Sequence, residues 1–277
     1  MKGNISLHAV ILFCNMKEVF IKFFDNIGKK AISFFEYVGG IVILLFNTLM
    51  WILRLDIRIN LTIQQAALLG VDSIFIVFVT TFFSGAVVSL QLAELAVRYG
   101  LAKFIGGGVA IAMCRELAPM LTAVVVAGRA GSAITAEISS MKVTEQLDAL
   151  TVMAVSPVKY LVVPRLIACL IAFPILTLFA DFAGVLGGGF VANILAGVDL
   201  TIYTDSIKNM LAMKDFWGGL YKSLFFAVEV VLISCYQGMT TKGGAAGVGI
   251  STTGSVVVSI IVVFISNYLL SSIIFSL

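Results

Sequence analysis

Long apolar stretches separated by short polar ones run through the chain from residue 72 onward. Five of them are long enough to cross a bilayer, because a helix that rises 1.5 Å per residue needs about 20 apolar residues to do so. The five stretches cover residues 72–93, 104–127, 160–195, 217–239 and 252–275. The pattern therefore predicts an all-α integral membrane protein with five transmembrane helices.

Two further stretches precede these spans. Lysines are scattered through 5–24, and 34–53 is apolar but marginal in length, with Arg54, Asp56 and Arg58 directly after it. We interpret both as N-terminal helices that lie in the membrane interface or enter it only partly. A sixth full span at 34–53 is the alternative.

Lysine and arginine set the expected orientation, because cytoplasmic loops are enriched in both residues. With the N-terminus in the cytoplasm, twelve of them fall on the inner side and four on the outer side. Five spans then place the C-terminus outside and residues 127–159 in the cytoplasm. The outer segment 196–216 is polar enough for a short loop.

Composition agrees with a membrane protein. The 277 residues are 60% hydrophobic and 12% charged, with a mean hydropathy of +1.10, whereas a soluble domain averages about 25% charged residues. A net charge of +3, spread along the chain, gives no reason to expect nucleic acid as a partner. His8 is the only histidine, which argues against histidine-based metal or triad chemistry. We interpret the cysteines as buried small hydrophobes, since none has paired spacing: Cys14, Cys114, Cys169 and Cys235.

Residues 127–150, AGRAGSAITAEISSMKVTEQLDAL, form a stretch of small and then charged residues between two spans. Gly128, Ser132, Ala136 and Ser140 recur every fourth residue, so a helix places them on one face. Such a face lets another backbone approach closely in a bilayer.

The second half of this stretch is charged. Lys142, Glu145 and Asp148 are three residues apart and share one helical side, with Glu137 further back. The pattern fits a cytoplasmic amphipathic helix that lies on the membrane or docks into the groove of a partner. A solvated loop helix is the simpler interpretation, and composition alone does not choose between them.

Charged residues also occur inside the apolar stretches. Arg115 and Glu116 lie in the second span, Asp181 in the third, and Lys222 and Glu229 in the fourth, seven residues apart on one face. An ion inside a membrane is costly, so each is a candidate functional residue. The alternative is that they pair with one another and hold the helices together.

The sequence contains no G-x-x-x-x-G-K-[ST] motif, which would mark a phosphate-binding loop. The glycine-rich segments 106–108 and 184–189 lie within apolar stretches, and we interpret them as helix-packing or kink positions. If this protein performs energised work, the ATPase is another chain.

One long segment resembles a known family. RELAPMLTAVVVAGRAGSAITAEISSMKVTEQLDALTVMAVSPVKYLVVPR, residues 115–165, closely resembles the signature region of the MlaE/YrbE family. Members are permease subunits of ATP-driven lipid transporters that work with MCE-domain proteins. The resemblance extends to 64–91 and 221–259 and covers roughly 36–275. It implies a permease domain over 36–277, preceded by an N-terminal interfacial segment over 1–35.

The resemblance implies a homodimer in the cell inner membrane that moves phospholipid and maintains the lipid asymmetry of the envelope. Two ABC ATPase subunits would bind below it and an MCE-domain ring above it. ATP and Mg would be bound by the ATPase, so the chain itself would be no enzyme and hold no cofactor or metal. Residues 133–150 would form the coupling helix, with the ATPase contacts at Glu137, Lys142, Glu145 and Asp148.

The resemblance also implies where lipid binds. The counterparts of Arg115, Glu116 and Lys222 surround the lipid pocket of the family. Asn267 stands where the family usually has an aspartate, and Glu229 where an uncharged residue is expected. We infer that a carboxylate has moved from the fifth span to the fourth, which would make Glu229 the partner of Lys222.

Apolar residues of the first span are expected to line the space for acyl chains. We expect this lining to include Phe83, Val87 and Leu90. The competing functions are an ion-coupled secondary transporter and a non-transporting membrane scaffold. An intramembrane enzyme has little support, because no catalytic motif is present.

Overall fold

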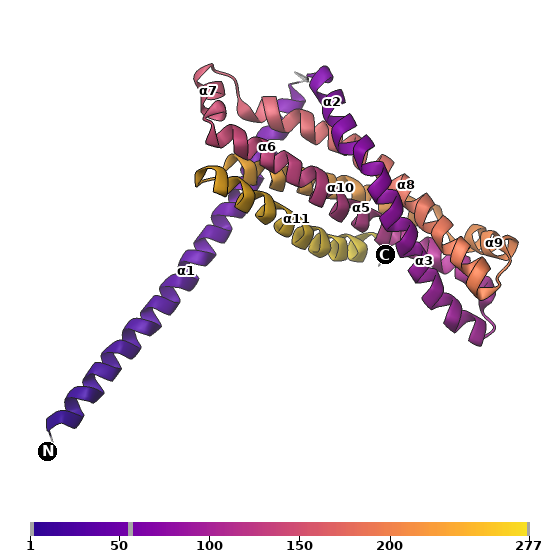
Figure 1. Ribbon diagram of the computed structural model, residues 1–277, viewed down its shortest axis with the longest axis horizontal. Helices are drawn as coiled ribbons and strands as arrows, with labels where there is room; N and C mark the ends of the chain where they lie inside the picture. The colour runs from indigo at the N-terminus through magenta and orange to yellow at the C-terminus, as the bar shows by residue number, and fades with distance from the viewer. Residues whose placement is uncertain (1–2, 55–57, 276–277) are drawn as a thin grey trace. The chain divides into compact units, whose positions relative to one another are not determined.

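The computed structural model describes residues 3–54 and 58–275, and in these residues all regular structure is helical (Figure 1). The chain divides into two compact units, Met1–Phe46 and Asn47–Leu277. Most of α1 (Gly3–Leu53) belongs to the first unit, and the side chains of His8 and Cys14 are outside what the structure describes.

The second unit contains every other helix. Several are joined end to end, with π-helical or 3-10 turns between them. The elements are α2 (Ile59–Gly70), η1 (Val71–Ser73), α3 (Ile74–Arg98), η2 (Ala102–Phe104), α4 (Ile105–Ala112), η3 (Met113–Leu117), α5 (Ala118–Val126), η4 (Ala127–Gly131), α6 (Ser132–Val143), α7 (Gln146–Val152), η5 (Val158–Val162), α8 (Val163–Ala196), α9 (Leu200–Met210), α10 (Met213–Met239) and α11 (Gly244–Phe275).

Six helical segments of the described chain are long and apolar enough to cross a membrane. They are Gly28–Leu53, Ile59–Glu94, Ala102–Val143, Val158–Leu195, Met213–Met239 and Gly244–Phe275. The third has 42 residues, about 63 Å of helix, whereas the hydrocarbon core of a bilayer is about 30 Å thick. One end of this rod must therefore extend out of the membrane or the rod must be strongly tilted.

The expected count of five spans is not confirmed. The additional candidate is Gly28–Leu53, which includes the stretch 34–53 that we interpreted as interfacial. The N-terminal region is also one continuous helix, α1, where the scattered lysines led us to expect two. Long helices tolerate lysine because its charged head can reach solvent past an apolar stem.

Glycines allow two long helices, α3 and α8, to pack closely. A side chain at Gly85 would collide with the carbonyl of Gly184, and one at Gly187 would collide with the carbonyl of Phe82. Small residues permit such backbone contact between helices in a membrane. The interpretation of the 184–189 segment as a packing element is confirmed.

The core of the second unit lies around α10, which packs on α5, α6, α8 and α11. Phe226 and Val230 are among the buried apolar residues of α10. The helix α11 packs on it through small residues at every fourth position, including Ser251, Ser255 and Ser259. Many large apolar side chains of α11 remain exposed on the surface of the single chain, among them Ile261, Phe264 and Leu269.

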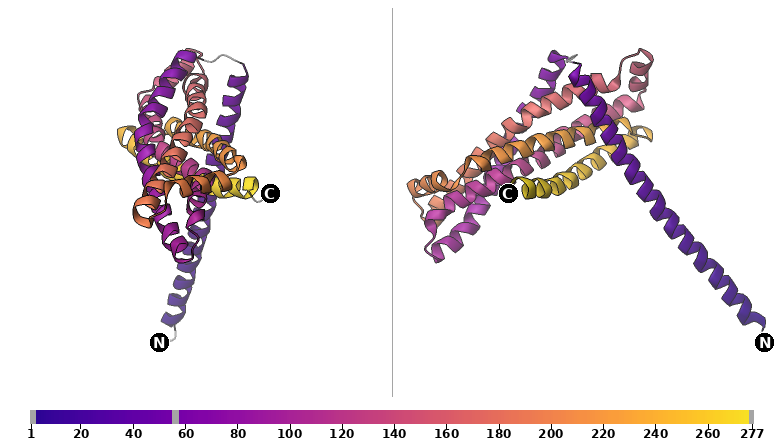
Figure 2. Two further views of the ribbon diagram at one scale, coloured as in Figure 1. Left: turned by 90° about the vertical axis from the view of Figure 1, so that its right-hand side faces the viewer. Right: turned by 180° about the vertical axis from the view of Figure 1, so that it is seen from behind.

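Within the second unit, α7 and α9 lie at opposite ends of the long helices (Figures 1 and 2). The helix α9 is a correction, because we expected 196–216 to be a short loop. Asp199 caps this helix by accepting a hydrogen bond from the backbone N–H of Thr201 at 2.9 Å. Tyr203 and Ser206 are its buried residues. An amphipathic helix therefore lies at the end opposite the α6–α7 turn.

Candidate functional site

A π-helical turn, η3, carries the two charged residues of the second span. Single π turns inside α-helices occur frequently at functional sites. Pro119 follows this turn and has no backbone N–H, so it cannot donate to the carbonyl of Arg115 four residues earlier. Lys222 Nζ donates to that carbonyl instead, at 2.7 Å.

Lys222 lies at the centre of a polar cluster built from η3, α10 and α11. Its side chain is 0% exposed. The acceptors around Nζ are Arg115 O at 2.7 Å, Glu116 Oε2 at 2.9 Å, Ser271 Oγ at 2.6 Å and Asn267 Oδ1 at 3.3 Å. An ammonium has three donors, so its hydrogen-bonding capacity is fully used and its charge is compensated.

Glu116 is the negative partner in this cluster. Besides Lys222, its carboxylate accepts hydrogen bonds from Asn267 Nδ2 at 2.9 Å and from Ser271 Oγ at 2.7 Å. Charge-assisted hydrogen bonds of this kind are shorter and stronger than neutral ones. We name Glu116, Lys222, Asn267 and Ser271 the central cluster.

Arg115 forms a second ion pair next to the central cluster. Its guanidinium contacts Asp215 Oδ1 at 2.7 Å, and Asp215 is 1% exposed. The same carboxyl accepts from the backbone N–H of Ala212 at 3.0 Å and so caps α10. The ring of Phe275 lies 4.7 Å from the Arg115 guanidinium and 5.1 Å from the Lys222 ammonium, within cation–π range.

The inferred partnership of Glu229 with Lys222 is wrong. Glu229 Oε2 accepts a hydrogen bond from Ser266 at 2.8 Å, whereas Glu116 is the carboxylate bonded to Lys222. Asn267 is in the central cluster, where its amide bonds both charges. An amide can replace a carboxylate at this position because Glu116 already balances the ammonium.

Two members of this site were missed in the sequence, Ser271 and Asp215. Ser271 is four residues after Asn267, hence on the same helical face. Asp215 is seven residues before Lys222, which is the spacing of two helical turns. Asp215 lies within 196–216, which the sequence predicts to be a loop, and a loop residue has no helical periodicity with Lys222.

The site described so far has two positive and two negative side chains, which leaves it balanced in charge. Arg115 and Glu116 each keep 37% of the side chain exposed. The arrangement therefore offers a guanidinium and a carboxylate edge to a polar group that enters from outside the chain.

The three apolar residues expected to contact acyl chains lie on another helix. Phe83, Val87 and Leu90 are all exposed on α3, at spacings that place them on one face. The opposite side of α3 packs on α8. A single chain therefore presents these residues and the central cluster on separate helices.

Asp181 is a further acid in the interior, on α8. It is buried, lies close to Cys114, and its Oδ1 has no hydrogen-bond partner among the described residues. Three cysteines are free and buried, as expected: Cys114, Cys169 and Cys235. Cys169 and Cys235 are completely enclosed among buried residues, whereas the Cys114 thiol lies against the Asp181 carboxyl.

The stretch 127–150 is not one continuous helix. The helix α6 ends at Val143, and α7 begins at Gln146. Between them Glu145 has a positive φ of 60°, a left-handed conformation that ends a helix. Lys142, Glu145 and Asp148 therefore do not share one helical side, although Lys142 Nζ still reaches Asp148 at 2.9 Å across the turn.

The expected small-residue face of this stretch is not the one that packs within the chain. Gly128 and Ser140 are exposed, and nothing lies within 4 Å of a side chain built at Gly128. The buried face is formed by the residues one position earlier in the sequence. There Thr135 donates a hydrogen bond to Ser234 O at 3.1 Å, and Ser139 forms a hydrogen bond with Thr241 at 2.7 Å. Gly128 and Ser140 are therefore open to a contact outside this chain, whereas Ser132 and Ala136 are half-buried.

Glu137 differs from the other charged residues of this stretch. Its carboxylate is 2.7 Å from the guanidinium of Arg165, a residue on α8 that is only 3% exposed. Glu137 and Arg165 also line a cavity of about 410 Å³ next to α2. Glu145 and Asp148 are exposed, and these two remain accessible to a partner.

Most of the chain matches known proteins. The model of the family described as Permease MlaE matches residues 62–273. A probable ABC transporter permease protein of Synechocystis sp. is 43% identical over 252 residues, which are 91% of this chain and 96% of the relative.

Two other relatives extend this result. A probable ABC transporter permease protein of Rickettsia felis is 40% identical over 251 residues, which are 91% of this chain and 97% of the relative. The chloroplastic protein TRIGALACTOSYLDIACYLGLYCEROL 1 of Arabidopsis thaliana is 39% identical over 224 residues, which are 81% of this chain and 64% of the relative.

Proposed function

Because this chain belongs to the MlaE family of ABC transporter permeases, we propose that it is the transmembrane subunit of an ATP-driven phospholipid transporter. It moves lipid between the inner membrane and an MCE-protein conduit and so maintains the lipid asymmetry of the envelope. The observation that carries the proposal is the family match over residues 62–273. The Arabidopsis relative, which is named after a galactolipid, supports lipid as the substrate class.

The central cluster and Arg115 form the proposed headgroup site. Its charges are balanced within the chain, so a zwitterionic headgroup, which carries one charge of each sign, exchanges partners with groups already present and leaves no buried ion unpaired. Asn267 and Ser271 supply polar atoms that bond either sign of charge. Phe83, Val87 and Leu90 contact acyl chains once a second copy covers their face of α3.

The proposed assembly is a homodimer with two ABC ATPase subunits and an MCE-domain protein. The exposed small residues Gly128 and Ser140 and the exposed apolar residues of α11 support a further protein contact in the membrane. ATP and Mg bind to the ATPase. With Gly28–Leu53 in the interface and the other five candidate segments crossing the membrane, the N-terminus is in the cytoplasm and the C-terminus in the periplasm, with the α6–α7 turn on the ATPase side.

In the proposed mechanism, ATP binding closes the ATPase dimer, and the α6–α7 region transmits this motion to the permease dimer. The rod from Ala102 to Val143 is one helical segment that joins this region to η3. A displacement at its end therefore reaches Arg115 and Glu116 without crossing a flexible loop. The lipid pocket of the permease dimer then opens or closes, and lipid passes to or from the MCE conduit.

Purification in mild detergent tests the class of the protein. The tagged chain is isolated from its native host, and mass spectrometry identifies everything retained. A P-loop ATPase, an MCE protein and bound phospholipid together are the expected result. An intact homodimer without any ATPase would contradict the proposal and favour an ion-coupled transporter or a scaffold.

Charge reversal tests the coupling role. Glu145→Lys is expected to weaken ATPase binding and stop lipid movement without unfolding the helices, because Glu145 is exposed and makes no ion pair in the described chain. Lys214→Glu, an exposed reversal at the other end of the second unit, is the matched control. Normal lipid transport and normal ATPase binding in Glu145→Lys would contradict the proposed coupling role of Glu145.

A neutral pair tests the headgroup site. Glu116→Gln/Lys222→Met removes both charges together, so no buried ion remains without its partner. Lipid transport is expected to fall while ATPase binding survives. Wild-type transport in this variant would mean that the central cluster only holds the helices together.

A further inference from the structure

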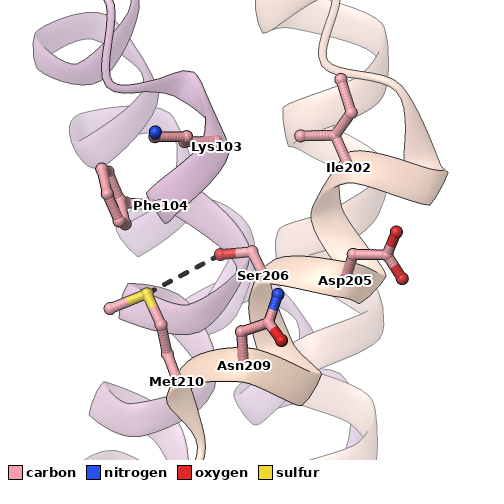
Figure 3. Close-up of a pocket in the computed structure, with 7 residues that line it drawn as sticks. All are labelled: Lys103, Phe104, Ile202, Asp205, Ser206, Asn209 and Met210. Atoms are coloured by element: carbon pink, nitrogen blue, oxygen red, sulfur yellow. Dashed lines mark hydrogen bonds between the residues drawn. The ribbon is translucent and has the colours of Figure 1, made fainter.

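A cavity that none of the central-cluster residues lines lies between η2 and α9. Its volume is about 330 Å³, within the range of small-molecule sites. Figure 3 shows its lining, with Lys103 and Phe104 of η2 on one wall and Ile202, Asp205 and Asn209 of α9 on the other. None of these residues takes part in the function proposed above.

Two polar groups of this cavity are uncommitted. Lys103 has a described contact with the ring of Phe104, at 5.2 Å, but no ion-pair partner among the described residues. The amide of Asn209 likewise has no hydrogen-bond partner in the part of the chain that the structure describes. Ser206, in contrast, already accepts from the backbone N–H of Gly107 at 2.9 Å. The free donors are therefore an ammonium and an amide, which together suit an oxyanion.

The opposite wall carries a weakly held acid. Asp205 contacts Lys208 at 3.4 Å, with both side chains mostly exposed. Exposed pairs of this kind contribute little, so the carboxylate is available to another cation. A ligand with only negative charge would be repelled by Asp205, whereas a ligand with both a phosphate and an ammonium would meet a partner on each wall.

The surroundings are those of a membrane surface. Phe104, Ile202 and Met210 line the cavity and are exposed, and large apolar or aromatic residues continue beside it at Tyr99 and Leu101. Aromatic and apolar side chains next to a lysine at the ends of transmembrane helices are typical of the interface between lipid and water. The ligand therefore has an apolar part next to its charged part.

We propose that this cavity binds the headgroup of a zwitterionic aminophospholipid. Lys103 and Asn209 donate to the phosphate, Asp205 accepts from the primary ammonium, and Phe104, Ile202 and Met210 contact the upper part of the acyl chains. The site is separate from the central cluster and needs only that this end of the helices lies at the membrane surface. It supplies a place where lipid binds outside the transport pathway proposed above.

Photolabelling of the purified full-length chain tests the site. The probe is a photoactivatable phosphatidylethanolamine, and peptide mass spectrometry reads labelling at residues 99–105 and 200–213. Unlabelled dihexanoyl phosphatidylethanolamine is expected to compete, and dihexanoylglycerol, which lacks the phosphate, is not. Equal competition by both would overturn the proposal, because contact would then be apolar only.

Three variants assign the contacts. Lys103→Gln is expected to weaken binding about tenfold, the effect of losing one charge-assisted hydrogen bond. Asp205→Asn is expected to abolish the preference for phosphatidylethanolamine over phosphatidylglycerol. Lys214→Gln, at an exposed lysine of α10 that does not line the cavity, is the control and is expected to keep wild-type labelling.

The outcomes separate this site from the transport function. Equal labelling of the wild type and Lys103→Gln would overturn the proposed lipid site, provided that size and thermal stability show both proteins to be folded. Loss of labelling when an MCE protein is added, with that protein crosslinked at Ile202, would show a protein contact there and would also overturn it. Glu116→Gln/Lys222→Met is expected to label normally here even where it fails to transport lipid.

Discussion

Charged residues gather in two parts of this permease, the central cluster and the α6–α7 region, and their surroundings differ. In the central cluster the ammonium of Lys222 is buried and every hydrogen-bonding position is filled from within the chain. In the α6–α7 region Glu145 and Asp148 are exposed, and the pair between Lys142 and Asp148 faces solvent. The first set of charges holds three helices together, whereas the second leaves charge available to another protein.

Glu137 lies on the boundary between these two cases. It belongs by sequence to the α6–α7 region, but its partner Arg165 is almost completely buried. A charged residue in an amphipathic stretch is thus no sign that a partner protein binds it. The burial of the residue it pairs with decides between a structural and a docking role.

The largest expected effect is at Glu116. Glu116→Gln leaves the buried Lys222 ammonium without a carboxylate, and stranding a buried charge costs about 3 kcal/mol or more. We expect a clear fall in the apparent Tm in detergent. Glu116→Gln/Lys222→Met is expected to recover most of it, and a double variant less stable than Glu116→Gln would show that the pair is not the stabilising unit.

Glu137→Gln is expected to have a smaller but measurable effect. It leaves the buried Arg165 guanidinium with Leu161 O, at 3.0 Å, as its described acceptor, and we expect a loss of about 1–3 kcal/mol. Thermal unfolding in detergent measures it against Glu145→Gln, which is expected to leave the Tm unchanged. Equal Tm values for the two variants would place Glu137 with the exposed charges.

Glu145→Gly separates stability from docking. Glycine adopts a positive φ without the strain of a side chain, so the variant is expected to gain about 1 kcal/mol, with Glu145→Ala as the strained control. ATPase binding, measured by co-purification, is expected to weaken because the carboxylate is gone. A variant that loses stability would show that the Glu145 side chain holds the turn.

Lys142→Gln is expected to change stability by no more than about 0.5 kcal/mol, because the pair with Asp148 is exposed and solvent screens it. Its thermal unfolding in detergent is compared with that of Glu137→Gln. A loss as large as that of Glu137→Gln would contradict the division into buried and exposed charges.

The smallest effect is a pH dependence at the cap of α9. Hydrogen bonds from the backbone and then the side chain of Thr201 lower the pKa of Asp199 below its usual value. A lowered pKa means that the ionised cap stabilises α9 above about pH 3.9, the unfolded value, and that this is lost as pH falls through the folded pKa. Hydrogen exchange of α9 between pH 6 and pH 3 measures it, and Asp199→Asn is expected to remove the pH dependence. If hydrogen exchange of α9 depended on pH in the same way in Asp199→Asn, the dependence would come from another titratable group.

Much of the site could be predicted, since a charge within an apolar stretch stands out without any structure. Arg115, Glu116 and Lys222 were found in this way, and the structure brings them together with Asn267. Ser271 and Asp215 were missed because a serine in a span and an acid in a presumed loop carry no such signal. The wrong partner was assigned to Lys222 because spacing along one helix says nothing about the neighbouring helix.

The sequence by itself determined that the chain is helical, that it is a multi-pass membrane protein, and that it belongs to a permease family. These conclusions follow from local hydropathy and from long motifs, which need no knowledge of distant contacts. Only the tertiary structure decided which face of residues 127–143 is buried, where the helix breaks at Glu145, and which carboxylate bonds Lys222. Each depends on which side chains from remote helices occupy the same space, and burial of a charge is affordable only where those neighbours supply its partners.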